Sequence, residues 1–283
     1  MRWESGGRSK NIEDRRGLGG AGMVGGGGIG MLVLVLVISF ISGRNPLELL
    51  SQVEQSAPAG NAVPAGEVPA NDPQAQRVSF VLHETEQTWT RIFQQNRGTY
   101  QEPVLVLFDG SVRSACGSAS SAVGPFYCPA DQKVYLDLSF FRELDSRFGA
   151  PGDFAEAYVI AHEVGHHVQT LLGVSEKVNQ ARSRMSQEEG NQMSVRQELQ
   201  ADCYAGVWGF HTNSKNLLEP GDIDEGLSAA AAIGDDRLQK QGQGYVAPES
   251  WTHGSAQQRQ RWLRRGLDSG DINQCDTFSA GAI

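Results

Sequence analysis

The sequence has fewer basic residues than acidic ones, and the deficit lies in one part of the chain. Over 283 residues it carries 24 Lys and Arg against 33 Asp and Glu, a net charge of −9. Residues 1–44 contain six basic and three acidic residues, so residues 45–283 carry a charge of −12. Phosphate backbones are bound by basic faces. The acidic body therefore argues against nucleic acid as a partner.

Cysteine is scarce, with four residues, and no two of them form a CxxC-type pair. This spacing argues against a zinc site built from cysteines. Four cysteines allow three pairings. We favour Cys116–Cys128, which would close a short loop rich in Ser, Gly and Ala, and Cys203–Cys275, which would tie the C-terminal tail to a helix. The alternative is four free buried thiols.

Long apolar runs are rare as well, and one stretch stands out. Met31–Ser42 (MLVLVLVISFIS) contains no charge. With the Gly-rich run from Met23 it gives about 20 uncharged residues, roughly the length that crosses a bilayer as a helix. Five basic residues precede it, and Lys and Arg favour the cytoplasmic side. We therefore predict a single-pass anchor in the inner membrane, with the lipid bilayer as a partner, a cytoplasmic N-terminus and a periplasmic, extracytoplasmic domain. A cleaved signal peptide and a soluble Gly-rich segment are the alternatives.

Composition divides the chain into four parts. Residues 1–22 are polar, basic and rich in Gly, which predicts a disordered cytoplasmic tail, and residues 23–43 form the predicted transmembrane anchor. Residues 44–73 lack apolar periodicity and are rich in Ala, Pro, Gly and Asn, as flexible linkers are. Residues 74–283 remain for one folded domain.

Periodicity predicts a mainly helical α+β domain with a small sheet before its central helix, preceded by one transmembrane helix. Short apolar or alternating runs predict strands at Val104–Phe108 and Lys133–Leu138. The pattern at Asp153–Leu172 predicts a strong helix, with Asp153 as its cap and Glu156 in capping-box position. Helical spacing also marks four further segments: 76–96, 190–212, 224–240 and 256–267.

The central helix carries the pattern HExxH, at His162-Glu163-Val164-Gly165-His166. Residues four apart share one helix face, so two imidazoles can converge on one ion, and zinc is bound by imidazole and carboxylate groups. Glu163 lies one position along, where it can activate a zinc-coordinated water as general base without binding the metal. The alternative is a helix that merely carries surface His and Glu.

Glu198, in a second predicted helix, is the candidate for a third ligand. Asp202 lies four residues later and so shares its face. Glu198 would complete a His₂Glu zinc site with one open position. Asp202 would then accept the free N–H of a ligating histidine. The alternative for this pair is a solvated acidic face.

Other polar residues rank lower as members of the site. His253 could donate a hydrogen bond to the oxyanion of a tetrahedral intermediate, or it could simply cap a turn or helix. His167 is rotated by about 100° from His166 on the helix. His83 lacks a second histidine, and His211 lies too far along its helix. Two tyrosines are possible donors for which core packing is the simpler role: Tyr158 and Tyr204.

Seven motifs follow one another along nearly the whole chain. They are Met1–Ser5, Ser9–Arg16, the Gly-rich run, Cys128–Asp131, Ala161–Gln169 (AHEVGHHVQ), Arg196–Ala205 (RQELQADCYA) and Thr252–Arg259 (THGSAQQR). In this order they resemble the bacterial "putative neutral zinc metallopeptidases", a family of membrane-anchored proteins.

The resemblance implies a zincin-type fold with one zinc ion. It implies zinc at His162 and His166, Glu163 as the catalytic residue, and Glu198 as the third ligand, as in other Glu-zincins. It also implies an edge strand that binds substrate backbone, for which Lys133–Leu138 is the candidate.

The sequence thus predicts a zinc metallopeptidase that hydrolyses peptide bonds of a peptide or protein substrate on the outer side of a membrane. Two alternatives stay open: a non-catalytic envelope binding protein with a structural metal site, and a zinc amidase that acts on non-peptide amides. The intact Glu163 favours catalysis, because a structural site needs no general base.

Overall fold

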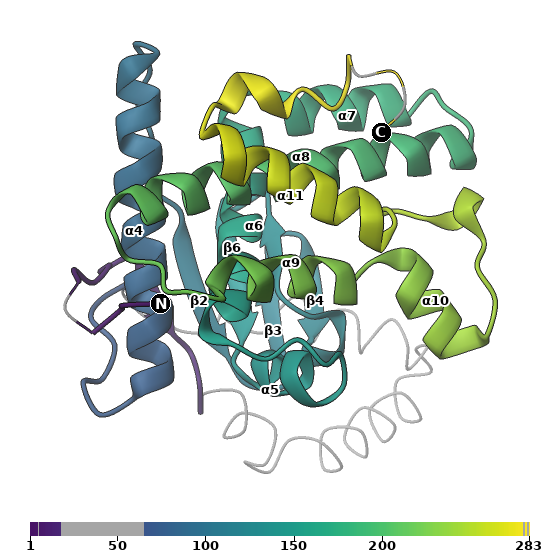
Figure 1. Cartoon of the computed structure of the whole chain (residues 1–283). Helices are drawn as coiled ribbons and strands as arrows, with labels where there is room; N and C mark the ends of the chain where they lie inside the picture. The colour runs from purple at the N-terminus through teal and green to yellow at the C-terminus, as the bar shows by residue number, and fades with distance from the viewer. Residues whose placement is uncertain (5, 18–64, 280, 282) are drawn as a thin grey trace, which may run out of the picture.

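The computed structural model describes residues 1–4, 6–17, 65–279, 281 and 283, and this part is mostly helical with two small sheets (Figure 1). The helices are α4 (Pro73–Gln95), α5 (Ser139–Ser146), α6 (Asp153–Leu171), α7 (Val174–Arg182), α8 (Gln187–Ser214), α9 (Asp222–Ala232), α10 (Asp235–Gln243) and α11 (Ala256–Ser269). The strands are β1 (Ile12–Asp14), β2 (Val104–Phe108), β3 (Ser111–Ser114), β4 (Gly117–Ser120), β5 (Phe126–Cys128) and β6 (Lys133–Asp137). Short 3₁₀ turns are η1 (Ser121–Val123), η2 (Pro248–Ser250) and η3 (Ile272–Cys275).

The larger sheet has the strand order β1-β2-β6-β5, and β3 and β4 form a separate hairpin. β2 pairs in parallel with β1 and β6, while β5 is antiparallel to β6. Four of the five residues of β2 are buried. Both faces of this strand are therefore covered, which explains why its sequence is continuously apolar rather than alternating.

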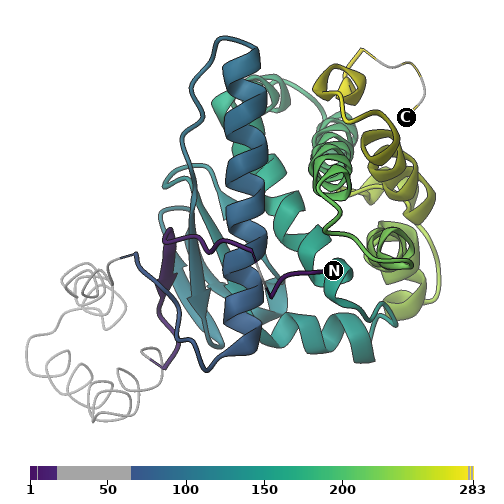
Figure 2. The ribbon, with the colours of Figure 1, turned by 60° about the vertical axis from the view of Figure 1, so that its left-hand side comes forward.

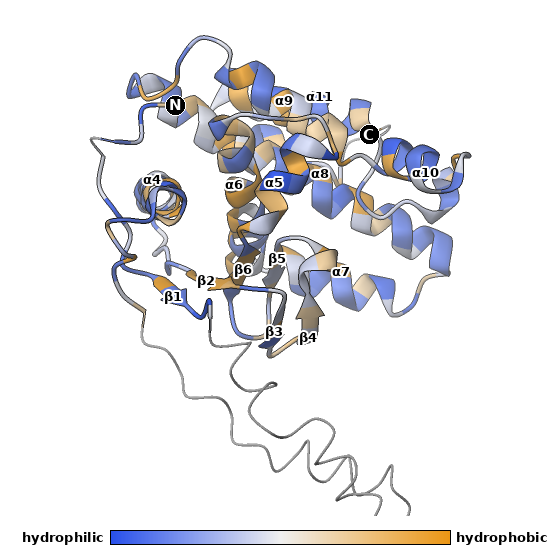
Figure 3. Ribbon diagram, turned by 90° about the horizontal axis from the view of Figure 1, so that it is seen from below, coloured by the Kyte–Doolittle hydropathy of each residue, from blue (hydrophilic) through white to orange (hydrophobic). Residues whose placement is uncertain are grey.

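Helix α6 lies between the larger sheet and a layer formed by α8, α9 and α11, and it is largely apolar in colour (Figure 3). Most of its residues are buried because both sides of the helix are covered. The helix begins at Asp153, so Asp153 is not the cap that we predicted. Gly152 precedes it with φ 124°, a backbone conformation that favours glycine. The first turn is stabilised instead by the Glu225 carboxylate of α9, which accepts the Phe154 N–H at 3.1 Å.

Two glycines let α8 and α11 approach to backbone contact. A Cβ atom on Gly206 would lie 2.2 Å from the Leu263 carbonyl oxygen, and one on Gly266 would lie 2.0 Å from the Cys203 carbonyl oxygen. Since no larger residue fits at either position without moving a backbone, these glycines set the spacing of the two helices.

Both disulfides predicted from the sequence are present. Cys116–Cys128 links the turn between β3 and β4 to strand β5, and Cys203–Cys275 links α8 to η3. The described part of the chain contains no free cysteine.

The N-terminal segment differs from the disordered tail that its composition predicts. Ile12–Asp14 form strand β1 at one edge of the larger sheet, beside β2 and close to α4 (Figure 2). Ser9 and Asn11 donate hydrogen bonds to the buried Glu86 carboxylate of α4, at 2.6 and 2.9 Å. Composition suggested disorder because these partners lie more than 70 residues away in the sequence.

The predicted membrane location and the transmembrane part of the predicted fold class are wrong. In the ranges that the structure describes, no helix has the length and apolar character needed to cross a bilayer. The segment expected to be the anchor, 23–43, lies outside those ranges, as does most of the expected linker. In addition, β1 is hydrogen-bonded to β2, whereas the prediction placed these two segments on opposite sides of a membrane. Hydropathy and charge are local properties of a segment, and neither detects a long-range strand pairing.

Candidate metal centre

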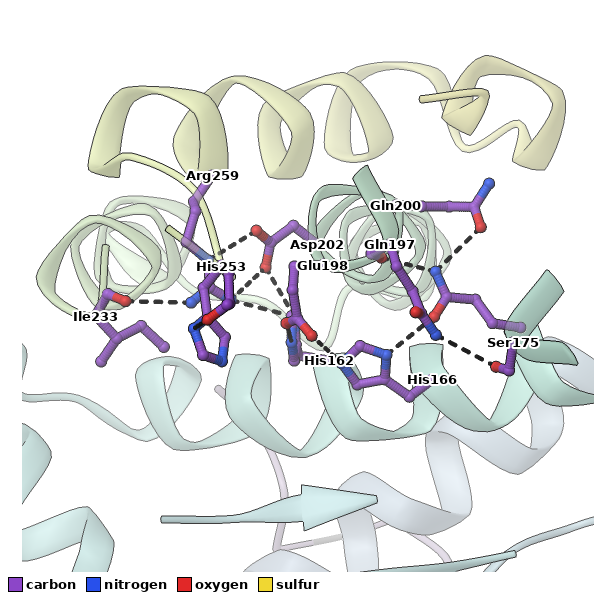
Figure 4. Close-up of polar contacts among 12 residues, drawn as sticks. His162, His166, Ser175, Gln197, Glu198, Gln200, Asp202, Ile233, His253 and Arg259 are labelled. Carbon is purple, nitrogen blue, oxygen red and sulfur yellow. Dashed lines mark hydrogen bonds and ion pairs between the residues drawn. The ribbon is translucent and has the colours of Figure 1, made fainter. Parts of the chain in front are cut away.

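Helices α6 and α8 bring three potential metal-binding side chains together (Figure 4). His162 and His166 lie one turn apart on α6, and Glu198 faces them from α8. Their ligand atoms all lie within 4.8 Å of one another. His162 Nε2 is 3.1 Å from one Glu198 oxygen, and His166 Nε2 is 3.4 Å from the other. The three residues predicted as ligands from the sequence are thus neighbours in the fold.

A glycine within the HExxH pattern makes this convergence possible. A Cβ atom on Gly165 would lie 3.0 Å from the Ala201 carbonyl oxygen and 3.2 Å from the Ala201 Cα atom of α8. Contacts of this length are tight, so the two helices pack with small residues facing each other. The carboxylate of Glu198, one turn before Ala201, can then reach the histidines.

The donor set fits a zinc ion. With bonds of about 2.0–2.1 Å in a tetrahedral site, neighbouring donor atoms lie about 3.3 Å apart. The two nitrogen–oxygen separations, 3.1 and 3.4 Å, agree with that distance. The side chains of His162, His166 and Glu198 are 8%, 14% and 18% exposed, so solvent reaches the group. Three protein donors leave one coordination position free, as in catalytic zinc sites.

A buried ion pair contacts the Nδ1 side of the His162 ring. His162 Nδ1 lies 2.8 Å from a carboxylate oxygen of Asp202, which is fully buried. Arg259 of α11 binds both oxygens of Asp202 at 2.9 Å, and the Tyr158 hydroxyl donates to the same carboxylate at 2.6 Å. An acceptor at Nδ1 favours the tautomer whose Nε2 lone pair points toward Glu198.

In the metal-free protein the same contacts determine the charges of these groups, and zinc binding at His162 Nε2 requires the loss of the proton there. Burial by itself lowers the pKa of His162, but the charge of Asp202 and the hydrogen bonds with Asp202 and Glu198 raise it to about 10. Burial by itself raises the pKa of Asp202, yet Arg259 and His162 lower it to about 2. The two histidines also hold the pKa of Glu198 well below its usual range, against the effect of burial. Both carboxylates therefore stay ionised at neutral pH.

Neutral groups support His166. Its Nδ1 atom lies 2.9 Å from the side-chain oxygen of Gln169. The Gln169 amide nitrogen donates to the side-chain oxygen of Gln200 at 3.0 Å, and the Gln200 amide nitrogen donates to the Cys275 carbonyl oxygen at 3.0 Å. This chain of amides therefore ends at the disulfide that joins Cys275 to α8.

A cleft of about 680 Å³ opens over the metal-binding group. Glu163 lines this cleft together with His162, His166 and Glu198. Glu163 is 8% exposed and does not belong to the cluster of ligand atoms. Glu163 thus borders the same space as the cluster, which is where a general base is needed.

The sheet edge beside the cleft is β5, and not β6 as expected from the sequence. Phe126 and Tyr127 of β5 line the cleft, while β6 is paired on both sides, with β2 and β5. The prediction that Lys133–Leu138 is the edge strand is therefore wrong. It failed because β5 has only three residues, too few to leave an alternating pattern in the sequence.

His253 also lines the cleft, with 51% of its side chain exposed. The Asp235 carboxylate accepts the backbone N–H groups of Thr252, His253 and Gly254 at 2.6–2.9 Å, and lies 3.3 Å from His253 Nδ1. Burial by itself lowers the pKa of His253, but Asp235 and Glu198 raise it overall. The structure thus holds a readily protonated imidazole at the wall of the cleft.

The remaining candidates make structural contacts. The fully buried His167 lies 2.6 Å from the Gln101 carbonyl oxygen and 3.1 Å from the Tyr127 hydroxyl, and so links α6 to β5. The others are His83 near Glu86, His211 against the Gly270 carbonyl, Tyr204 edge-on to Trp89, and Tyr158 on Asp202.

Three contributors were not predicted from the sequence: Arg259, Gln169 and Gln200. Arg259 ends one of the recognised motifs, but residue order does not pair it with Asp202, 57 positions away. Gln169 follows His166 by three residues, and helix spacing could have identified it as a partner. Gln200 can be recognised as a contributor only from its contact with η3 in the structure.

An HExxH helix, a glutamate from a second helix and a cleft beside a sheet edge thus occur together in this structure. A family model described as "Putative neutral zinc metallopeptidase" matches residues 1–278, and the chain belongs to this family, as its motifs predicted.

Its relatives match it to different extents. The uncharacterized protein YpfJ of Escherichia coli strain K12 is 47% identical over 284 residues, which cover 98% of this chain and 99% of that protein. Uncharacterized proteins of Mycobacterium bovis and Mycobacterium tuberculosis are 50% identical over 195 residues, 65% of this chain and 65% of theirs. No solved structure matches the chain.

Proposed function

We propose that this protein hydrolyses peptide bonds, with one zinc ion held by His162, His166 and Glu198 and with Glu163 as the general base. The observation that carries the proposal is the convergence of the three donors from two helices in the cleft that Glu163 also lines. When bound, zinc polarises the scissile carbonyl group and lowers the pKa of the attacking water toward 7.

The protein's own residues complete the reaction. Glu163 accepts a proton from the attacking water and delivers it to the leaving amine as the peptide bond breaks. His253 donates a hydrogen bond to the oxyanion that develops on the scissile carbonyl, and its raised pKa favours the protonated donor. The substrate backbone pairs with the outer edge of β5, the last strand of the larger sheet among the described residues. Asp202 and Gln169 keep the two histidine rings in orientation.

The general-base role is tested by Glu163→Gln. We expect the wild-type chain to contain one zinc ion, to cleave a denatured protein substrate, and to lose activity with a chelator. The variant should keep its zinc and lose about 10²- to 10⁴-fold in turnover, because the proton acceptor is gone. Metal analysis and digestion assays measure the two effects.

Glu188→Gln is the matched control, since Glu188 is exposed in the first turn of α8. It should keep both zinc and activity. Full turnover in Glu163→Gln would reject the mechanism. Bound zinc without cleavage of any peptide would favour a binding protein, and hydrolysis confined to non-peptide amides would favour an amidase.

A further inference from the structure

The cleft has different chemistry on the two sides of the metal centre. Toward α5 and α10 the lining includes Glu143, Arg147 and Gln241 together with five apolar residues, Phe140, Phe148, Val159, Ile233 and Leu238. We call these five residues the apolar end. Toward α7 and the first half of α8 the lining is polar and consists of Ser175, Arg182, Ser194 and Gln197. Figure 4 shows Ile233 and Ser175 on opposite sides of His162 and His166.

Val159 places the apolar end next to the reacting groups. It lies four residues before Glu163 on α6, one helical turn away on the same face, and both residues line the cleft. A substrate residue adjacent to the scissile bond therefore lies within one helical turn of Val159.

The two phenylalanines form a wall of the apolar end on α5 and the loop that follows it. The ring centroids of Phe140 and Phe148 are 6.4 Å apart, within the range of aromatic contact. Phe140 also lies against Gly124, 3.5 Å from the position of a Cβ atom, just before β5. This wall is thus continuous with the sheet edge. Leu238 of α10 lines the cleft from a different element.

Two charged residues of α5 and the loop that follows it, Glu143 and Arg147, also line the cleft, with side chains that are 45% and 64% exposed. Arg147 pairs with Glu143 at 3.5 Å and lies over the Phe148 ring at 5.1 Å. A charged substrate side chain packed against the five apolar residues would lose water without gaining a polar partner from them, which is unfavourable. An apolar side chain would lose only unfavourable contact with water.

We propose that the apolar end is the specificity pocket of the cleft, and that it takes a bulky apolar side chain next to the scissile bond of an extended polypeptide. The residues it accepts are Leu, Ile, Met and Phe. This inference rests on the proposed peptidase function. A hydrophobic pocket discriminates by about 10- to 200-fold for even small differences in apolar size, so selection over Gly, Asp or Lys should reach about 100-fold.

The test is the cleavage pattern of the full chain on a complex mixture of denatured polypeptides. Mass spectrometry identifies the residues on both sides of each cut bond, with chelator-treated enzyme as the control. We expect Leu, Ile, Met and Phe to be enriched at one fixed position beside the bond. Chelator-sensitive cleavage without such enrichment would overturn the pocket and leave the peptidase function standing. Absence of any chelator-sensitive cleavage would instead refute the proposed function.

Variants on two different elements connect the preference to the apolar end. Phe148→Ala and Leu238→Ala should each lower kcat/KM for substrates with Leu or Phe by about tenfold and leave Ala substrates nearly unchanged. Phe210→Ala is the matched control, because Phe210 lies on α8, is 37% exposed and does not line the cleft. Zinc content and the thermal midpoint confirm that each variant is folded. Unchanged preference in both folded variants would contradict the assignment.

Discussion

The two histidines of the candidate metal centre lie one turn apart on α6, yet the protein supports them in different ways. The Asp202 carboxylate contacts His162 Nδ1, and Arg259 binds both oxygens of this carboxylate. The neutral amide of Gln169 contacts His166 Nδ1 and is linked through Gln200 to the C-terminal segment. Hydrogen bonds between charged groups are stronger than neutral ones, but a buried charge that loses its partner costs more.

This difference shows how one short motif depends on two separate parts of the fold. The support of His162 depends on the close packing of α8 and α11, which the glycines at 206 and 266 permit. The support of His166 depends on η3 and on the disulfide that holds η3 to α8. Perturbing each part should therefore affect one histidine more than the other.

The largest effect is expected from Arg259→Met. It removes the cation that binds both oxygens of the buried Asp202 carboxylate and leaves His162 as the remaining charged partner, and we expect the free energy of unfolding to fall by about 3–5 kcal/mol. Urea denaturation of the metal-free protein measures this loss. Arg264→Met, at an exposed position of the same helix, should stay within about 0.5 kcal/mol of the wild type. A loss below 1 kcal/mol for Arg259→Met would show that the ion pair is not the main support.

A smaller loss is expected when the C-terminal disulfide is removed by Cys203→Ser with Cys275→Ser. The unfolded chain gains freedom, so stability should fall by about 2–4 kcal/mol, and zinc should bind more weakly because the carbonyl that ends the amide chain is released. Calorimetric titration with zinc measures the second effect. The pair Cys116→Ser with Cys128→Ser is the control, since it opens a disulfide outside this chain. Equal weakening of zinc binding by both pairs of substitutions would contradict the dependence of zinc binding on the Cys203–Cys275 disulfide.

The smallest change in stability is expected for Gln169→Leu, which removes only neutral hydrogen bonds. The free energy of unfolding should fall by about 1–3 kcal/mol, because polar groups of His166 and Gln200 lose a partner. Zinc affinity should fall by about 10- to 100-fold, as for other partners of metal ligands. Gln192→Leu, exposed on α8, serves as the control. A stability loss equal to that of Arg259→Met would show that the neutral contacts of His166 stabilise the fold as much as the charged contacts of His162.

Features that depend on residues three or four apart could be predicted from the sequence. The HExxH spacing placed His162 and His166 on one face of a helix that exists in the structure, and the same spacing placed Glu198 and Asp202 on one face of another. The pairing of the cysteines was also predictable, because there were few alternatives and loop composition favoured one of them.

Features that depend on distant partners could not be predicted. The edge strand was assigned to β6 because β5 is too short to show a pattern, and the first 17 residues were assigned to a tail because their partners lie on α4 and β2. Arg259 was overlooked as a partner of Asp202 for the same reason.

The sequence by itself determined which residues are able to bind a metal, since ligand chemistry and helix periodicity are local properties of the chain. The tertiary structure alone decided that α6 and α8 lie close enough for Glu198 to meet the histidines, and that the two rings are supported by different networks. The physical reason is that helix packing depends on small residues facing each other across long sequence distances, as Gly165 and Ala201 do. No local pattern records which pairs will meet.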